Sequence, residues 1–260
     1  LELYSSGDSR VFLTARIALA SLTAFLVSLL IAPATIRFLA RHCGERIASD
    51  SPRLNELHAA KNRTPSMGGS FILISLLIAD LLWSDLSNRY LQAGIFLACG
   101  LGIVGGIDDW IKLRTSRKGL TARQKFIAQC LLSLATTWYV MTPLEQVPGG
   151  TGFIWPFGNL IIPLGSLFLL WGMFVLTGSS NAVNLADGLD GLAGGCLLFS
   201  GSALLALCYL AGHKGMADYL QIPFVPGSGE LAVLLGATVG ATLGFLWFNC
   251  HPAQVVMGDT

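Results

Sequence analysis

Five aspartates lie at or near the ends of long apolar segments, in a chain where charged residues are scarce. They are Asp108, Asp109, Asp187, Asp190 and Asp259. Carboxylates at membrane depth are costly and usually face an interior cavity, so a group of them indicates a functional site. Their hard oxygens suit magnesium, which proteins typically hold with one or two carboxylates together with substrate phosphates. The sequence therefore predicts a cation and phosphate site, against the alternative that each aspartate is an ordinary solvated loop residue.

A second polar pattern is a stripe in which Asn181, Asn184, Asp187 and Asp190 recur every three residues. This spacing places them on one face of a helix or of a tight helical turn. A packing face would carry Leu or Val at such positions, so a polar stripe at the start of a membrane span indicates a cation or ligand site. The four histidines form no pair at ligand spacing, which disfavours zinc.

Cationic residues accompany these acids in two segments. The adjacent Asp108 and Asp109 point about 100° apart on a helix and are expected to do different work, while Lys112 could form a plain ion pair with Asp109. The segment 61–69 places Lys61, hydroxyls and a glycine pair before an apolar run, where backbone amides could receive a phosphate. An ordinary helix start, capped by Thr64 with a proline at the first position, explains this segment equally well.

The composition fixes the class of protein that must position these residues. Only 31 of the 260 residues are charged, 53% are hydrophobic, and the mean hydropathy is +0.65. This is too little polar surface for a water-soluble globule, whereas lipid requires none. The net charge of +1 excludes a strongly basic nucleic-acid binder. The six cysteines include no CxxC pair and are interpreted as buried free thiols.

We therefore predict an all-α polytopic membrane protein, with residues 1–260 forming a single integral membrane domain. A spanning helix needs about 20 mostly apolar residues. Seven segments of that order occur, at 17–36, 67–83, 91–107, 126–144, 160–176, 191–212 and 231–249.

Lysines and arginines orient this predicted bundle, because cytoplasmic loops keep an excess of them. Twelve of the 16 lie in two stretches, residues 37–63 and 112–125. Both stretches are expected on the cytoplasmic side. Alternation of the spans then brings residues 177–189 and 249–260 to the same side, although neither contains a Lys or Arg.

Four motifs, taken together, resemble one known family. They are TPSMGG at 64–69, GIDDWIK at 106–112, NAVNLADGLDGLAGG at 181–195 and FNxxPAxVxMGD at 248–259. They occur in order along essentially the whole chain, and the third is highly specific. The chain resembles the phospho-N-acetylmuramoyl-pentapeptide transferases, the MraY translocases, within the superfamily of polyprenyl-phosphate N-acetylhexosamine-1-phosphate transferases.

The resemblance implies an enzyme of peptidoglycan synthesis, and so of cell wall biogenesis, with ten spans in the bacterial cytoplasmic (inner) membrane. It would transfer phospho-MurNAc-pentapeptide from UDP-MurNAc-pentapeptide to undecaprenyl phosphate. The products would be lipid I and UMP, the cofactor Mg²⁺, and the active site would lie on the cytoplasmic face. The lipid bilayer and these two substrates are the expected partners, nucleic acid is not, and the apolar exterior with small-residue faces permits a homodimer.

The resemblance also implies roles for single residues. The catalytic group comprises Asp108, which would deprotonate or position the lipid phosphate, nearby Asp109, and Asp259, which would bind the metal. The substrate-binding group comprises Lys61, Ser66, Lys112, Lys125, Asn181, Asn184, Asp187 and Asn249. Whether Asp108 acts as base or as nucleophile stays open.

Two departures from the family pattern qualify this interpretation. Where the family usually has an aromatic residue thought to stack on uracil, this chain has Val256, which cannot stack. The sequence also begins without methionine and stops at Thr260, before the remaining three expected spans and a late cytoplasmic loop rich in histidine. We therefore expect it to be a fragment that is inactive alone.

Two other functions compete with this one. A sibling transferase that moves N-acetylglucosamine-1-phosphate from UDP-GlcNAc to the same lipid would use the same aspartates. An ion-coupled transporter would instead place its acidic residues near the membrane midplane. The transporter is disfavoured by the positions of the aspartates, since four lie within a few residues of a predicted span end and Asp259 lies about ten residues beyond one.

Overall fold

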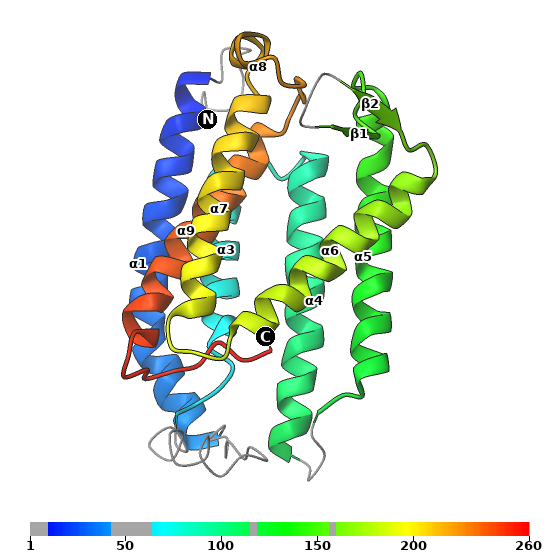
Figure 1. Ribbon diagram of the computed structural model, residues 1–260. Helices are drawn as coiled ribbons and strands as arrows, with labels where there is room; N and C mark the ends of the chain where they lie inside the picture. The colour runs from blue at the N-terminus through cyan, green and yellow to red at the C-terminus, as the bar shows by residue number, and fades with distance from the viewer. Residues whose placement is uncertain (1–9, 43–63, 115–118, 156–159, 260) are drawn as a thin grey trace.

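The computed structural model describes residues 10–42, 64–114, 119–155 and 160–259, which form a bundle of long helices (Figure 1). The elements in chain order are α1 (Arg10–His42), α3 (Gly69–Trp83), α4 (Arg89–Arg114), α5 (Ala122–Glu145), β1 (Gly152–Ile154), β2 (Ile161–Pro163), α6 (Leu167–Ala186), α7 (Leu192–Ala211), α8 (Lys214–Leu220) and α9 (Gly229–Asn249). Strands β1 and β2 pair as an antiparallel hairpin. The all-α membrane class predicted from the composition is confirmed.

Each predicted span falls on one of these helices. In the described part of the chain, six helices are long and apolar enough to cross a bilayer, and α3 is shorter, at 15 residues. One boundary was wrong. The span predicted at 160–176 is helix α6 at Leu167–Ala186, because residues 161–163 pair with β1 instead of opening the helix. This shift moves Asn181 and Asn184 onto the last turns of α6.

Helix α9 is the centre of the packing and lies against α1, α3 and α7. Its glycines allow the closest approach: a Cβ on Gly240 would lie 1.9 Å from the carbonyl oxygen of Ser21, and one on Gly244 would lie 2.6 Å from Ser28. Small residues at such contacts let membrane helices pack backbone to backbone. Helix α6 is packed much less tightly than α9. Thr177 is the one residue of α6 that is buried. It crosses the bundle obliquely beside α5 (Figure 1).

The helix ends sort into two sets. One end of the bundle carries the ends of α1, α4, α6 and α9 and the starts of α3, α5 and α7; the other carries the hairpin and α8 (Figure 1). The first end holds every described residue of the two cation-rich stretches, 37–42 and 112–125. It also holds the described residues of the predicted site.

A buried ion pair fixes the opposite end. Arg16 of α1 donates to both carboxylate oxygens of Glu230 on α9, at 2.8 and 2.5 Å, and to the carbonyl oxygen of Trp83 at 2.7 Å. The backbone amide of Asp85 also donates to Glu230, at 2.8 Å. Both side chains of the pair are largely buried. The pair therefore ties α1, α9 and the α3–α4 loop together.

We expect Arg16→Met and Glu230→Met each to lower the stability of the protein by about 3–5 kcal/mol, because each leaves one buried charge without its partner. The double variant should lose much less, since it leaves no such charge. Thermal unfolding in detergent measures all three. A double variant that is less stable than either single variant would contradict this account of the pair.

Candidate functional site

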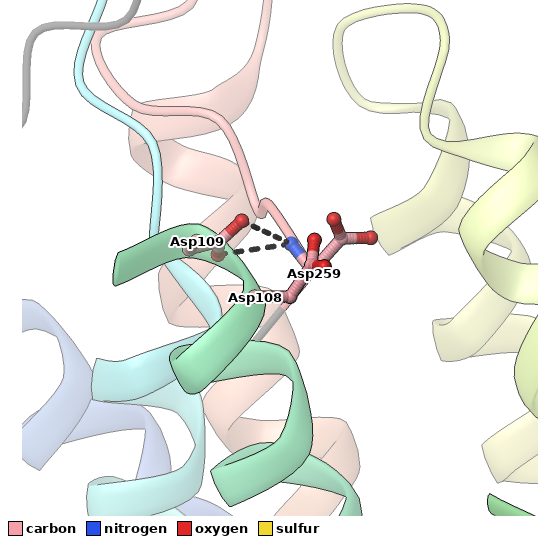
Figure 2. Close-up of side chains that lie close together, drawn as sticks. All are labelled: Asp108, Asp109 and Asp259. Carbon is pink, nitrogen blue, oxygen red and sulfur yellow. Dashed lines mark hydrogen bonds between the residues drawn. The ribbon is translucent and has the colours of Figure 1, made fainter. Parts of the chain in front are cut away.

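Three carboxylates meet at the first end of the bundle. Asp108 and Asp109 belong to the last two turns of α4, and Asp259 lies in the segment that follows α9 (Figure 2). Each offers one oxygen, and these oxygens all lie within 4.8 Å of one another. Asp108 and Asp109 are buried and Asp259 is half-buried. The predicted catalytic aspartates are thus neighbours in space, although 150 residues separate Asp109 from Asp259.

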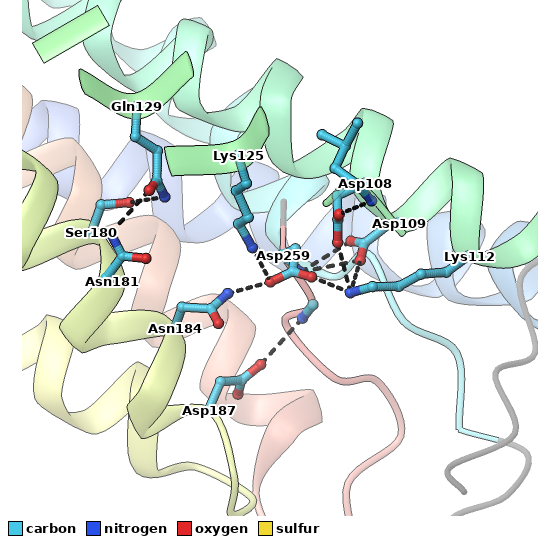
Figure 3. Close-up of polar contacts among 12 residues, drawn as sticks. Asp108, Asp109, Lys112, Lys125, Gln129, Ser180, Asn181, Asn184, Asp187 and Asp259 are labelled. Atoms are coloured by element: carbon cyan, nitrogen blue, oxygen red, sulfur yellow. Dashed lines mark hydrogen bonds and ion pairs between the residues drawn. The ribbon is translucent and has the colours of Figure 1, made fainter. Parts of the chain in front are cut away.

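Backbone hydrogen bonds hold Asp259 in this position. Its amide donates to both carboxylate oxygens of Asp109, at 3.3 and 3.1 Å. The amide of Gly258 donates to Asp187 at 3.2 Å. Gly258 has a φ of 78°, a conformation that favours glycine. This turn directs two consecutive amides to two carboxylates and leaves the Asp259 side chain facing the cluster (Figure 3).

The Asp259 turn rests on a pair of non-helical segments, residues 65–68 before α3 and residues 255–257. The amides of Gly68 and Gly69 donate to the carbonyl oxygens of Val256 and Met257, each at 2.9 Å, and the amide of Val256 donates to Pro65 at 3.0 Å. Non-helical backbone at membrane depth needs partners inside the protein. Here the two segments supply them to each other, which explains why α3 starts late and is short.

Two lysines and an amide surround the carboxylates (Figure 3). Lys112 contacts Asp259, lies 2.8 Å from Asp108 and 3.7 Å from Asp109, and so bridges all three. Lys125 of α5 donates to Asp259 at 2.7 Å, and the side-chain amide of Asn184 donates to the same oxygen. The predicted residues Lys112, Lys125 and Asn184 are therefore brought together, from three different helices.

The cluster as a whole is negatively charged. With Asp187 it comprises four carboxylates against two lysine ammonium groups, so two negative charges are left unbalanced among the described residues drawn in Figure 3. Two positive charges are what a divalent cation would supply. The donors are all oxygens of carboxylates and amides, the kind that magnesium prefers.

Burial and the neighbouring charges shift two pKa values in opposite directions. Burial raises the pKa of Asp187 to about 6, the Gly258 amide opposes this shift, and the nearby carboxylates of Asp259, Asp109 and Asp190 add to it. Burial also acts to raise the pKa of Asp259, but the contacts of its side chain with Asp108, Lys112, Lys125 and Asn184 outweigh burial and hold that pKa well below its usual range. Asp259 is accordingly the anionic centre of the cluster.

Asp108 connects the cluster to the start of α5. One of its oxygens accepts the backbone amide of Leu120 at 2.6 Å. Gly119 approaches so closely that a Cβ there would lie 2.6 Å from the same oxygen, and its φ is 95°. Two residues further on, Thr121 caps α5 in a capping box with Gln124. The carboxylate of Asp108 is thus held by the loop that precedes α5 as well as by Lys112.

A cavity of about 430 Å³ extends from the cluster into the bundle. Its polar end is formed by Lys125, Asn184, Asp187 and Asp259. The rest of its wall is mostly apolar and comes from α3, α4, α6 and α7, with residues such as Leu73, Leu101 and Val183. The cavity therefore offers charged groups at one end and hydrocarbon along its length.

Comparison with known proteins agrees with the motifs. The family model described as glycosyl transferase family 4 matches residues 91–260. A phospho-N-acetylmuramoyl-pentapeptide-transferase of Desulfosudis oleivorans is 43% identical over 251 residues, which cover 95% of this chain and 68% of that protein. One of Oleidesulfovibrio alaskensis is 44% identical over the same extent. The chain belongs to the phospho-N-acetylmuramoyl-pentapeptide transferase family.

Two predicted substrate-binding residues of this family member lie behind the cluster instead of facing it. Ser66 is buried beneath the Asp259 turn, where a Cβ on Gly258 would lie 2.7 Å from its hydroxyl. Asn249 is buried, and its side chain accepts from the amide of Gly191 at 2.9 Å and donates to the carbonyl oxygen of Val255 at 2.8 Å. Both residues thus shape the backbone around the site. Lys61 lies outside the described residues.

The four residues of the predicted polar stripe have three different surroundings in this transferase. Asn184 and Asp187 face the cluster. The side chain of Asn181 turns to α5, where it donates to Gln129 at 2.9 Å, and Asp190 lies 3.2 Å from His251. The prediction that all four residues share one helical face was wrong, because α6 ends at Ala186. Only Asn181 and Asn184 of the stripe lie on that helix. The stripe also closes a span instead of opening one.

Sequence reasoning missed Gln129, a buried amide of α5 that lines the cavity. Its side chain accepts from Asn181 and donates to Ser180 at 3.3 Å (Figure 3). One turn further along, Ser133 and Thr177 are hydrogen-bonded at 3.1 Å. These polar contacts hold α6 against α5 just above Asn184. A single uncharged glutamine inside an apolar segment is difficult to predict as a site residue, because only its polarity distinguishes it from its neighbours.

Proposed function

We propose that this protein transfers phospho-MurNAc-pentapeptide from UDP-MurNAc-pentapeptide to undecaprenyl phosphate, forming lipid I and UMP. The observation that carries the proposal is the meeting of Asp108, Asp109 and Asp259 with two lysines at the mouth of an apolar cavity, in a member of this family. One substrate is a soluble polyanion and the other a phosphate on a long hydrocarbon chain. A site with charge at one end and hydrocarbon beyond suits both.

The reaction exchanges one diphosphate linkage for another. An oxygen of the lipid phosphate forms a bond to the phosphorus that carries the sugar, and the bond from that phosphorus to the uridine phosphate breaks, releasing UMP. Little covalent work is required of the protein, so positioning and electrostatic stabilisation dominate. Asp108 would deprotonate or position the lipid phosphate; the contacts of its carboxylate with a backbone amide and with Lys112 support this role.

The remaining side chains handle charge and orientation. Lys112 and Lys125 form ion pairs with Asp259 and would offset the charge of the phosphates. Asn184 and Asp187 line the polar end of the cavity, where the nucleotide sugar would lie. Asp109 receives the Asp259 amide and so keeps the turn in place.

Magnesium is the cofactor that we propose. Asp259 would bind it, with Asp108 and Asp109 close enough to share the task, and the two unbalanced negative charges of the cluster fit a divalent cation. Bound together with a diphosphate, it would supply Lewis-acid stabilisation of charge on the phosphate oxygens. We propose that the protein lies in the bacterial cytoplasmic membrane with the cluster at the cytoplasmic face, because the described residues of the cation-rich stretches lie at the same end as the cluster.

The proposal is tested by transfer assays on the purified full-length protein with undecaprenyl phosphate. We expect UDP-MurNAc-pentapeptide to yield a lipid product and UMP. The activity should vanish after chelation and return when Mg²⁺ is added. UDP-GlcNAc should give no product.

Two results would contradict this proposal, one its substrate and the other its cofactor. Product from UDP-GlcNAc but not from UDP-MurNAc-pentapeptide would identify the sibling transferase. Undiminished UMP release after complete chelation would remove magnesium from the mechanism while leaving the substrate assignment intact.

A further inference from the structure

The β1–β2 hairpin lies at the end of the bundle opposite the carboxylate cluster, beside the start of α6 (Figure 1). Both isoleucines of β2 are exposed, Ile161 by 48% and Ile162 by 44%. Successive strand residues point to opposite faces, so neither face of this strand is covered by the rest of the described protein. In water, one face of such a hairpin would be polar, and an uncovered two-stranded hairpin is marginally stable at best.

The apolar surface of the hairpin continues onto α6. Phe153 of β1 packs edge-on against Trp171, with ring centroids 5.5 Å apart, and Trp171 lies 6.2 Å from Phe174. Exposed large apolar side chains follow along the same helix. They are Leu167, Leu170, Trp171 and Phe174. The hairpin is therefore continuous with the surface that α6, as a membrane helix, turns to lipid.

The hairpin and α6 differ in charge from the other segments at this end of the bundle. Residues 146–186 contain no charged side chain. Helix α8 carries Lys214 and Asp218, and the α3–α4 loop carries Asp85. The hairpin thus lacks the charged groups that its neighbours carry. Trp155, directly after β1, and Trp171 of α6 are of the residue type that gathers at membrane–water interfaces.

We propose that the β1–β2 hairpin lies within the headgroup interface of the membrane leaflet opposite the carboxylate cluster, with lipid as its partner. Two physical requirements fix this depth. The apolar side chains on both faces favour leaving water. Among the described residues each strand pairs with one neighbour and leaves its other edge without a strand partner, which the hydrocarbon core does not tolerate. The interface satisfies both requirements.

The proposal is tested with a fluorescent NBD probe on single cysteines in a variant whose six cysteines are otherwise replaced. The probe positions are Ile161→Cys and Ile162→Cys in the hairpin, Phe174→Cys as the lipid-facing reference and Met216→Cys on α8 as the aqueous control. Met216 is as exposed as the isoleucines, at 43%, and lies at the same end. The full-length protein is reconstituted in liposomes, and quenching by iodide on both sides is compared with quenching by lipids that carry a shallow spin label.

We expect iodide to quench positions 161 and 162 several-fold less than position 216, and the spin-labelled lipid to quench them strongly. Iodide quenching equal to that of position 216 would overturn the proposal. So would protection from iodide without quenching by the lipid label, which would indicate a protein partner or a second copy of the chain. Leu160→Cys, also exposed, serves if either isoleucine variant fails to fold. The quenching measurement does not depend on transferase activity. Its result therefore tests the membrane position of the hairpin independently of the proposed function.

Discussion

Asp259→Asn in the full-length protein should reduce transfer by at least about 10³-fold, equivalent to about 4 kcal/mol of transition-state stabilisation. The substitution keeps the size of the side chain but removes the charge at which Lys112, Lys125 and Asn184 converge. It also removes the carboxylate proposed to bind magnesium. Initial rates of UMP release, measured over a range of Mg²⁺ concentrations, test both consequences.

Asp190→Asn is the matched control for this prediction. Asp190 is an aspartate at the same end of the bundle, but it contacts the exposed His251 and does not belong to the three-carboxylate cluster. We expect this variant to keep activity within a few-fold of the unmodified protein. Equal losses in the two variants would mean that the general charge of this face matters, and not the cluster.

The membrane-spanning architecture could be predicted from the sequence because the length of an apolar run is a direct physical requirement of the bilayer. The same reasoning brought Asp108, Asp187 and Asp259 to one end, since alternating spans return every second loop to the same side. The start of α6 was not predictable in this way. Residues 161–163 are as apolar as a helix start, and only their pairing with β1 makes them a strand.

The internal arrangement of the site was harder to predict, because it depends on backbone contacts between distant segments. Nothing in the pattern of residues 65–69 shows that they pair with residues 255–257. Asn249 has a side chain suited to substrate, yet both ends of its amide are used by backbone groups. A motif therefore marks where a site is built, but the partners of each polar group decide which residues face the substrate.

Gly258→Ala should be nearly as damaging as removal of the carboxylate itself, although it changes no functional group. A Cβ at this position would lie 2.7 Å from the Ser66 hydroxyl, 2.8 Å from a carboxylate oxygen of Asp109 and 2.8 Å from the Met67 amide. The φ of 78° adds strain for any residue with a side chain. The turn can relieve these contacts only by moving away from α4, and it takes Asp259 with it.

We expect this displacement to cost at least about 100-fold in transfer rate, because misplacement of a catalytic group by about 1 Å is sufficient for such a loss. Gly106→Ala on α4 is the control, since a Cβ there meets nothing within 4 Å and the residue lies two positions before Asp108. It should leave transfer nearly unchanged. If the loss in Gly258→Ala comes from displacement of Asp259, more Mg²⁺ should be needed to reach the variant's maximal rate. A normal Mg²⁺ requirement with a reduced rate would show instead that Gly258 acts through the substrate-binding groups around Asp187.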